Sequence, residues 1–200
     1  YSSSKITDCI FSNNSATSGG GISGSSDCAP IITNCTFSGN SANEGGGIYL
    51  SYCFLPKVTN CTFSNNSANN GGGAYTVTNV WFTSCTFRGN TAVNKGGGIF
   101  NSYSPLTIVN CTFSGNSAGG ASSGGGILNF NSASTFINCT FNSNTSTALV
   151  NTSSNPCIKN SIFWGNDKEI YNDSSSSPEL SYCIVKGGYP AGINIIVQDP

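Results

Sequence analysis

The chain repeats itself about every 25 residues, and this repeat constrains the fold more than any other feature of the sequence. The motif Phe-x-x-Asn recurs seven times at spacings of 22 to 28 residues. Its phenylalanines are Phe11, Phe37, Phe63, Phe87, Phe113, Phe141 and Phe163, and its asparagines are Asn14, Asn40, Asn66, Asn90, Asn116, Asn144 and Asn166. A second motif, Gly-Gly-Gly followed by an apolar residue, alternates with it. One unit of this size cannot bury its own apolar side chains, so the units have to stack.

Aligning the repeats on the residue two positions before each Phe, or before Val185 in the eighth repeat, gives a nearly constant anchor column. The anchors are Cys9, Cys35, Cys61, Cys85, Cys111, Cys139, Ser161 and Cys183. The residue three positions before each anchor is apolar in all eight repeats, from Ile6 to Leu180. Because the eight repeats cover almost the whole chain, residues 1–200 are predicted to form a single domain.

Each repeat holds short runs of β-branched or aromatic residues, such as residues 48–50 and 57–59, separated by Gly, Asn and Ser. Such runs predict strands joined by turns. Helix-forming residues are scarce: the chain has no Met, and only 8% of its residues are charged. The sequence therefore predicts an all-β fold, a parallel β-solenoid of about eight coils in which each repeat is one coil.

In such a solenoid the apolar column, the anchors and the Phe residues point inward and fill the bore. The Asn of each Phe-x-x-Asn motif lies at a corner, where its amide can bond to the Asn of the next coil. Asn also tolerates the left-handed backbone that a corner requires. The Gly triplets mark a second corner, where positive φ or close contact between coils leaves no room for a Cβ.

The motifs in residues 61–68 and 71–74 resemble the repeats of the polymorphic outer-membrane proteins, which are autotransporter surface adhesins. Residues 160–200 are similar to the closing coils of secreted bacterial right-handed parallel β-helix proteins. These resemblances imply a right-handed, single-stranded parallel β-helix. They also imply an extracellular or cell-surface location.

Charge and composition argue against several functions. The net charge is −1 and the chain has no His, so it lacks a basic surface for nucleic acid or an anionic membrane, and it lacks the usual general base and metal ligand. Arg88 is the only Arg, and the eight acidic residues are scattered except in the 167–173 loop. We expect no catalytic residue, no cofactor and no metal site. A carbohydrate-active β-helix, either a polysaccharide-binding module or a lyase-like enzyme, is the alternative.

The ten Cys residues fall into two groups. Those of the anchor column are predicted to be buried free thiols, which behave as small hydrophobic side chains. Cys28 and Cys53 lie seven and eight residues before their anchors in successive coils, so they are the candidate disulfide. Cys157 has no evident partner.

An apolar strip follows the Gly motif on the outward side of the wall. Its members are Tyr49, Tyr75, Phe100, Leu128 and Tyr171. An exposed apolar strip predicts an interaction surface, whereas a strip covered by loops only stabilises its own sheet. The sequons at Asn151 and Asn172 are expected to be exposed glycosylation sites.

These features predict a non-enzymatic extracellular structural or adhesion protein. It would serve as a surface stalk or as the subunit of a head-to-tail fibre. Expected partners are the chain itself through end-to-end stacking, or a host or cell-surface protein or glycan. Nucleic-acid binding and membrane insertion by this segment are not expected.

Overall fold

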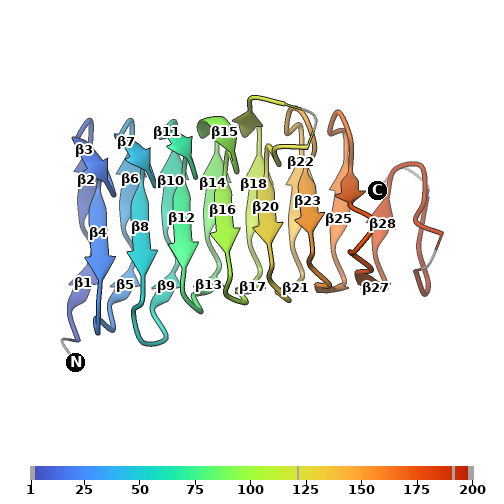
Figure 1. Ribbon diagram of the computed structural model, residues 1–200, viewed down its shortest axis with the longest axis horizontal. Coiled ribbons are helices and arrows are strands. Elements are labelled where there is room, and N and C mark those ends of the chain that lie inside the picture. The colour runs from blue at the N-terminus through green and yellow to red at the C-terminus, as the bar shows by residue number, and fades with distance from the viewer. Residues whose placement is uncertain (1–2, 121, 191, 198–200) are drawn as a thin grey trace.

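The computed structural model describes residues 3–120, 122–190 and 192–197, and the regular structure in them is all β-strand (Figure 1). The chain winds into a rod whose coils follow one another along the long axis from β1 to β28 (Figure 1). The predicted all-β parallel solenoid is therefore confirmed. The outermost residues of the predicted domain, 1–2 and 198–200, lie outside the described residues.

Each coil contributes short strands to four parallel sheets. The first sheet contains β1 (Lys5–Thr7), β5 (Ile31–Thr33), β9 (Lys57–Thr59), β13 (Trp81–Thr83), β17 (Thr107–Val109), β21 (Thr135–Ile137), β24 (Cys157–Lys159) and β27 (Glu179–Ser181). The second contains β2 (Ile10–Ser12), β6 (Thr36–Ser38), β10 (Thr62–Ser64), β14 (Thr86–Arg88), β18 (Thr112–Ser114), β22 (Thr140–Asn142), β25 (Ile162–Trp164) and β28 (Ile184–Val185). The third contains β3 (Ser15–Ser18), β7 (Ser41–Glu44), β11 (Ser67–Asn70), β15 (Thr91–Lys95) and β19 (Ser117–Ala118). The fourth contains β4 (Ile22–Ser25), β8 (Ile48–Ser51), β12 (Ala74–Val77), β16 (Ile99–Ser102), β20 (Ile127–Phe130), β23 (Leu149–Thr152) and β26 (Ile170–Asn172).

The register places equivalent residues of the repeats directly above one another. Phe37 pairs with Phe63, and Ile32 pairs with Val58 in the neighbouring sheet. The first and second sheets each have eight strands, which gives about seven full turns between the first coil and the last. The predicted columns are thus real columns of side chains in the rod.

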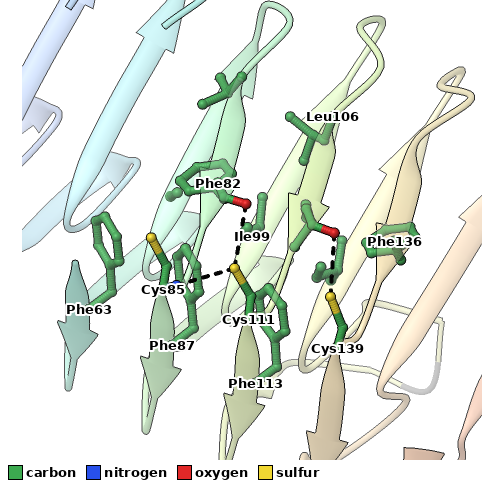
Figure 2. Close-up of a cluster of buried hydrophobic side chains, with 14 of the residues drawn as sticks. Phe63, Phe82, Cys85, Phe87, Ile99, Leu106, Cys111, Phe113, Phe136 and Cys139 are labelled. Atoms are coloured by element: carbon green, nitrogen blue, oxygen red, sulfur yellow. Dashed lines mark hydrogen bonds between the residues drawn. The ribbon is translucent and has the colours of Figure 1, made fainter. Parts of the chain in front are cut away.

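The Phe column forms a continuous stack inside the bore. Neighbouring rings from Phe11 to Phe163 have centroids 4.6 to 5.0 Å apart and are within 9° of parallel. Figure 2 shows Phe63, Phe87 and Phe113 in one row and the anchor Cys residues in another. Stacked rings at this spacing combine large buried area with a favourable ring geometry.

The Asn of each Phe-x-x-Asn motif forms the predicted ladder, which we name the corner Asn ladder. Asn66 is fully buried; its Oδ1 accepts hydrogen bonds from the backbone N and Nδ2 of Asn40, and its Nδ2 donates to Asn90 Oδ1 and Phe37 O, all at 3.0 Å. Every polar atom of the amide is thus satisfied, as a buried polar group requires. The expectation of left-handed backbone at the ladder Asn is wrong, because the preceding residue, Asn65, takes it (φ 54°).

The Gly triplets occupy the predicted second corner for both of the predicted reasons. Gly71 has φ +68°, and a Cβ there would lie 2.3 Å from Ala74 O. A Cβ on Gly72 would lie 2.5 Å from Gly97 O of the next coil. The sharp turn and the tight stacking of coils both exclude a larger residue.

A second ladder, which the sequence did not predict, lies inside the bore on the fourth sheet. This bore Asn ladder comprises Asn101, Asn129, Asn151 and Asn172, joined by Nδ2–Oδ1 hydrogen bonds of 3.2, 3.1 and 2.9 Å. Asn151 is fully buried and Asn172 is half-buried, with its Nδ2 donating to the Tyr189 hydroxyl. The expectation that these two are exposed glycosylation sites is therefore wrong.

A third Asn row, the outer Asn ladder, lies on the exposed bend between the first and second sheets. Asn60 Nδ2 donates to Asn34 Oδ1 at 2.8 Å, and Asn34 Nδ2 donates to Asp8 Oδ1 at 3.0 Å. Asn138 Nδ2 donates to Asn110 Oδ1 at 3.1 Å further along the rod. These residues have positive φ, such as 54° at Asn34, so they supply the left-handed bend.

Candidate functional site

The apolar strip, predicted as an exposed interaction surface, lies on the outward side of the fourth sheet but is largely covered. Phe100 and Leu128 are only 6% and 3% exposed, and they form a second hydrophobic cluster with Val150. Tyr49, Tyr75 and Tyr171 are half-buried. The exposure expected of this strip is therefore wrong at Phe100 and Leu128.

Lysine side chains account for part of this cover. Lys95 Nζ lies 5.5 Å from the ring centroids of both Phe100 and Phe130, and Lys168 Nζ lies 4.7 Å from that of Tyr171. Each lysine therefore places its charge over an aromatic ring. Burial, more than the nearby Glu44 carboxylate, raises the pKa of Tyr75 to about 12. The burial of Phe100 and Leu128 favours the alternative interpretation, in which the strip packs on its own sheet.

The seven Cys residues of the anchor column are free thiols, buried from Cys35 onward and half-buried at Cys9, and the remaining anchor is Ser161. Cys111 Sγ donates to Phe82 O and Val109 O at 3.6 and 3.3 Å and accepts from Cys85 N at 3.3 Å (Figure 2). Burial raises the pKa of the Cys139 thiol to about 12. A buried neutral thiol is inert, so Cys139 acts as a structural side chain of the bore.

Cys28 and Cys53 are joined as the sequence predicted. Their Sγ atoms are 2.07 Å apart and their Cα atoms 4.5 Å apart. The bond links successive coils across a separation of 25 residues. Cys157 is free and half-buried.

A hollow of the surface lies beside this disulfide, at the corner where the chain returns from the fourth sheet to the first. We name this turn the fourth corner. In three successive coils it consists of residues 52–56, 78–80 and 103–106. Because the middle segment is the shortest, the two longer segments flank a recess, the corner hollow, of about 520 Å³. Its lining residues are Tyr52, Cys53, Phe54, Leu55, Val77, Thr78, Asn79, Tyr103 and Ser104.

Two exposed tyrosines flank the corner hollow. Tyr52 and Tyr103 are 74% and 66% exposed, and both have left-handed backbone, with φ of 52° and 60°. The Tyr103 ring packs edge-on against Phe130, with centroids 5.3 Å apart. Between the tyrosines, Thr78 Oγ1 donates to Cys53 O at 2.6 Å. The hollow therefore has aromatic walls and a hydrogen-bonded floor.

The sequence carries a signal for this hollow in the spacing of its repeats. Asn66 and Asn90 are 24 residues apart, whereas Asn40 and Asn66 are 26 apart. The shorter coil contains the shorter fourth corner, residues 78–80. The motif columns alone did not predict the hollow. The two-residue deficit matches the difference between corners 52–56 and 78–80, but repeat length becomes a signal only together with the strand boundaries, because the repeat from Asn144 to Asn166 is shorter still at 22 residues.

The acidic loop at residues 167–173 closes the last coils and holds one buried carboxylate. Glu169 is 9% exposed; its Oε2 accepts a hydrogen bond from Asn166 Nδ2, and its Oε1 has no hydrogen-bond partner among the described residues. Burial raises the pKa of Glu169, an effect that the Asn166 amide and the Lys186 charge oppose. Asp173 accepts hydrogen bonds from Ser153 N and Ser176 Oγ at 3.0 and 2.7 Å. These carboxylates cap a ladder and a turn.

Metal-binding clusters and membrane-spanning helices are the remaining kinds of site to consider. Within residues 3–120, 122–190 and 192–197, no group of three or more His, Cys, Asp or Glu side chains is arranged to hold a metal ion. No helix long and apolar enough to cross a membrane occurs in that part of the chain.

The stacked parallel coils, the interior ladders and the Gly corners define a parallel β-helix repeat protein. The family model described as "Right handed beta helix region" matches residues 1–113 and 101–199. The chain belongs to this family, and the predicted right-handed parallel β-helix is confirmed. No curated protein matches the chain in a sequence comparison.

Proposed function

We propose that the chain is a non-enzymatic rod that acts outside the cell as a structural or adhesive element. The observation that carries this proposal is the uninterrupted stacking of equivalent residues along the axis. The Phe stack and the corner Asn ladder both run from the first coil to Phe163 and Asn166. Columns of this kind give a rigid wall of constant cross-section, which suits a spacer that holds a surface at a distance.

The covering of the last coil favours a stalk over a head-to-tail fibre. Tyr189 and Ile195 pack against the end of the core, and the bridges Ser181–Ile193 and Ile184–Ile196 hold this segment in place. Another subunit would therefore have to add to this segment and not directly to the core of the last coil. The resemblance to polymorphic outer-membrane protein repeats points in the same direction, toward a surface adhesin.

The disulfide supports the extracellular location. Bonds such as Cys28–Cys53 form and persist in oxidising compartments. Protease treatment of intact source cells tests this part of the proposal. The chain should be digested while cytoplasmic proteins survive, and protection of the chain until lysis would contradict it.

Small-angle scattering and negative-stain microscopy of the purified chain test the rod. At about 4.8 Å per coil, eight coils give a length of about 38 Å. Separate rods of this length are expected at all concentrations. Filaments that lengthen with concentration would replace the stalk with the fibre.

The alternative is a carbohydrate-active enzyme, and it predicts product release. The chain is incubated with neutral and acidic polysaccharides while reducing ends and unsaturated uronates are measured. We expect no release above that of a boiled control. Release that the Glu169→Gln variant abolishes would overturn the non-enzymatic assignment.

A further inference from the structure

We propose that the corner hollow is a binding site for an uncharged oligosaccharide, held against Tyr52 and Tyr103. This goes beyond the role of a rod, because a rod needs no such hollow. The site lies on the side of the solenoid, at the fourth corner of three successive coils.

The chemistry of the lining indicates this ligand. None of the lining residues is charged, so the hollow offers no ion pair to an acidic or basic ligand. Asn79 and Ser104 offer uncharged hydrogen-bonding groups beside the exposed rings of Tyr52 and Tyr103. A sugar unit presents an apolar C–H face to an aromatic ring and hydroxyl groups to polar neighbours, so it matches both features at once.

The spacing of the two tyrosines suits a short extended glycan. Strand register aligns Tyr52 with Thr78 and Thr78 with Tyr103, so the two tyrosines stand two coils apart, about 10 Å. A pyranose unit of an extended glycan advances by about one coil spacing. Sugar units at both ends of a stretch of about three would therefore meet the tyrosines, and the middle unit would lie over Asn79.

The two tyrosines occupy positions where other coils have small polar residues. The equivalent residues of the next two coils are Asn131 and Ser153, which also have left-handed backbone (φ 49° in both). Left-handed backbone costs less energy for Asn than for Tyr, so the backbone conformation does not explain why these two positions are aromatic. The contact with Phe130 restrains the Tyr103 ring, and the Cys28–Cys53 bond restrains the backbone next to Tyr52. Both restraints reduce the entropy cost of binding.

The test replaces each tyrosine by Asn, a residue that readily takes the left-handed backbone of these positions. Tyr52→Asn and Tyr103→Asn each remove one ring and introduce a residue that the corner of the fifth coil already carries. Tyr182→Asn is the matched control, because Tyr182 is 64% exposed and left-handed (φ 56°) but lies outside the hollow, and Asn160 is its equivalent one coil earlier. Circular dichroism and thermal unfolding establish that each variant folds.

The probes are cello-, xylo-, manno- and chitohexaose, with an oligogalacturonate and a proline-rich peptide for comparison, all measured by titration calorimetry. We expect at least one neutral glycan to bind the wild-type chain and Tyr182→Asn alike. Each of the other two variants should weaken that binding about tenfold. No binding of any neutral glycan at millimolar concentration, equal binding by the double variant, or preferential binding of the acidic glycan or the peptide would each overturn the proposal. The rod assignment rests on scattering and is unaffected by that outcome.

Discussion

The fourth corner is built in two different ways along one rod. In the N-terminal coils it holds the Cys28–Cys53 disulfide and the corner hollow, above an apolar bore that contains Leu50. In the C-terminal coils the position of Leu50 is taken by the bore Asn ladder. Asn101 Nδ2 donates to Ser132 Oγ at 2.6 Å, and Ser132 N donates to Ser154 Oγ at 3.0 Å.

This difference shows which parts of the repeat are free to change. The Phe stack, the corner Asn ladder and the Gly corners fix the path of each coil in both halves. The fourth corner can be built with a disulfide and an apolar bore, or with a network of Asn and Ser side chains whose polar groups are all hydrogen-bonded. A buried polar network stabilises a fold only when its members are satisfied, so the two solutions should not be interchangeable.

Replacing Leu50 by Asn, the residue that fills the same column in the C-terminal coils, should have the largest effect on the stability of the chain. Leu50→Asn places an amide in the apolar half, between Gly24 and Thr76, and should lower the free energy of unfolding by about 4 kcal/mol. Urea denaturation measures the change, with Leu50→Met as the control at about 1 kcal/mol. A cost for Leu50→Asn no greater than that of the control would mean that the two halves are equivalent.

Opening the disulfide should have the next largest effect and should be confined to the N-terminal half. A cross-link that closes a loop of 25 residues contributes about 3 kcal/mol, mainly by restricting the unfolded chain. Dithiothreitol should therefore lower the midpoint of thermal unfolding. The double variant Cys28→Ala/Cys53→Ala should unfold at that lower midpoint and should not respond to the reductant. If dithiothreitol lowered the unfolding midpoint of the double variant as much as that of the wild-type chain, a bond other than Cys28–Cys53 would be responsible.

Alkaline pH should weaken the C-terminal half at Cys139, as it should weaken the N-terminal half at Cys35 and Cys85, whose pKa values are also raised. The pKa of Cys139 is 9.0 in the unfolded chain and about 12 in the folded one, so the stability it contributes is complete below pH 9 and is lost as the pH rises toward 12. At pH 10 the expected loss is about 1.4 kcal/mol. The Cys139→Ser variant gives this anchor the side chain that the next coil carries at Ser161, and it should lose less between pH 9 and 10 in urea titrations. An identical loss would mean that other groups set the alkaline limit.

Removing one cation from the covered strip should have the smallest effect. Lys95→Gln takes away the charge over Phe100 and Phe130 and should cost about 0.7 kcal/mol. Lys57→Gln, at an exposed position of β9, is the matched control with no expected change. If both variants had the same stability, the charge of Lys95 over the rings would contribute nothing measurable to the stability of the strip.

The sequence predicted best where every coil repeats the same residue. Columns of Phe, Asn and Gly forced the parallel stacking, and the offsets of Cys28 and Cys53 from their anchors predicted their pairing. The bore Asn ladder was not predicted because its column reads Leu50, Thr76 and then Asn101, so the column changes from apolar to polar along the rod. The cover over Phe100 escaped for a different reason. Lys95 lies in another sheet, and only the three-dimensional path of the chain brings it over that ring.

The direction of the three Asn ladders gives the rod an electrical polarity. In the corner and bore ladders every hydrogen bond between neighbouring Asn side chains runs from Nδ2 to the Oδ1 of the later coil, so the amide dipoles along each ladder add, as the peptide dipoles of a helix do. The positive end of the corner ladder meets the Glu169 carboxylate, and that of the bore ladder meets the Tyr189 hydroxyl. The outer ladder runs the opposite way and ends on Asp8. The coils therefore share one shape, but the electrostatic potential changes along the rod. Glu169 and Asp8 lie at the ends of the corner and outer ladders, where a negative charge stabilises the row of aligned amides.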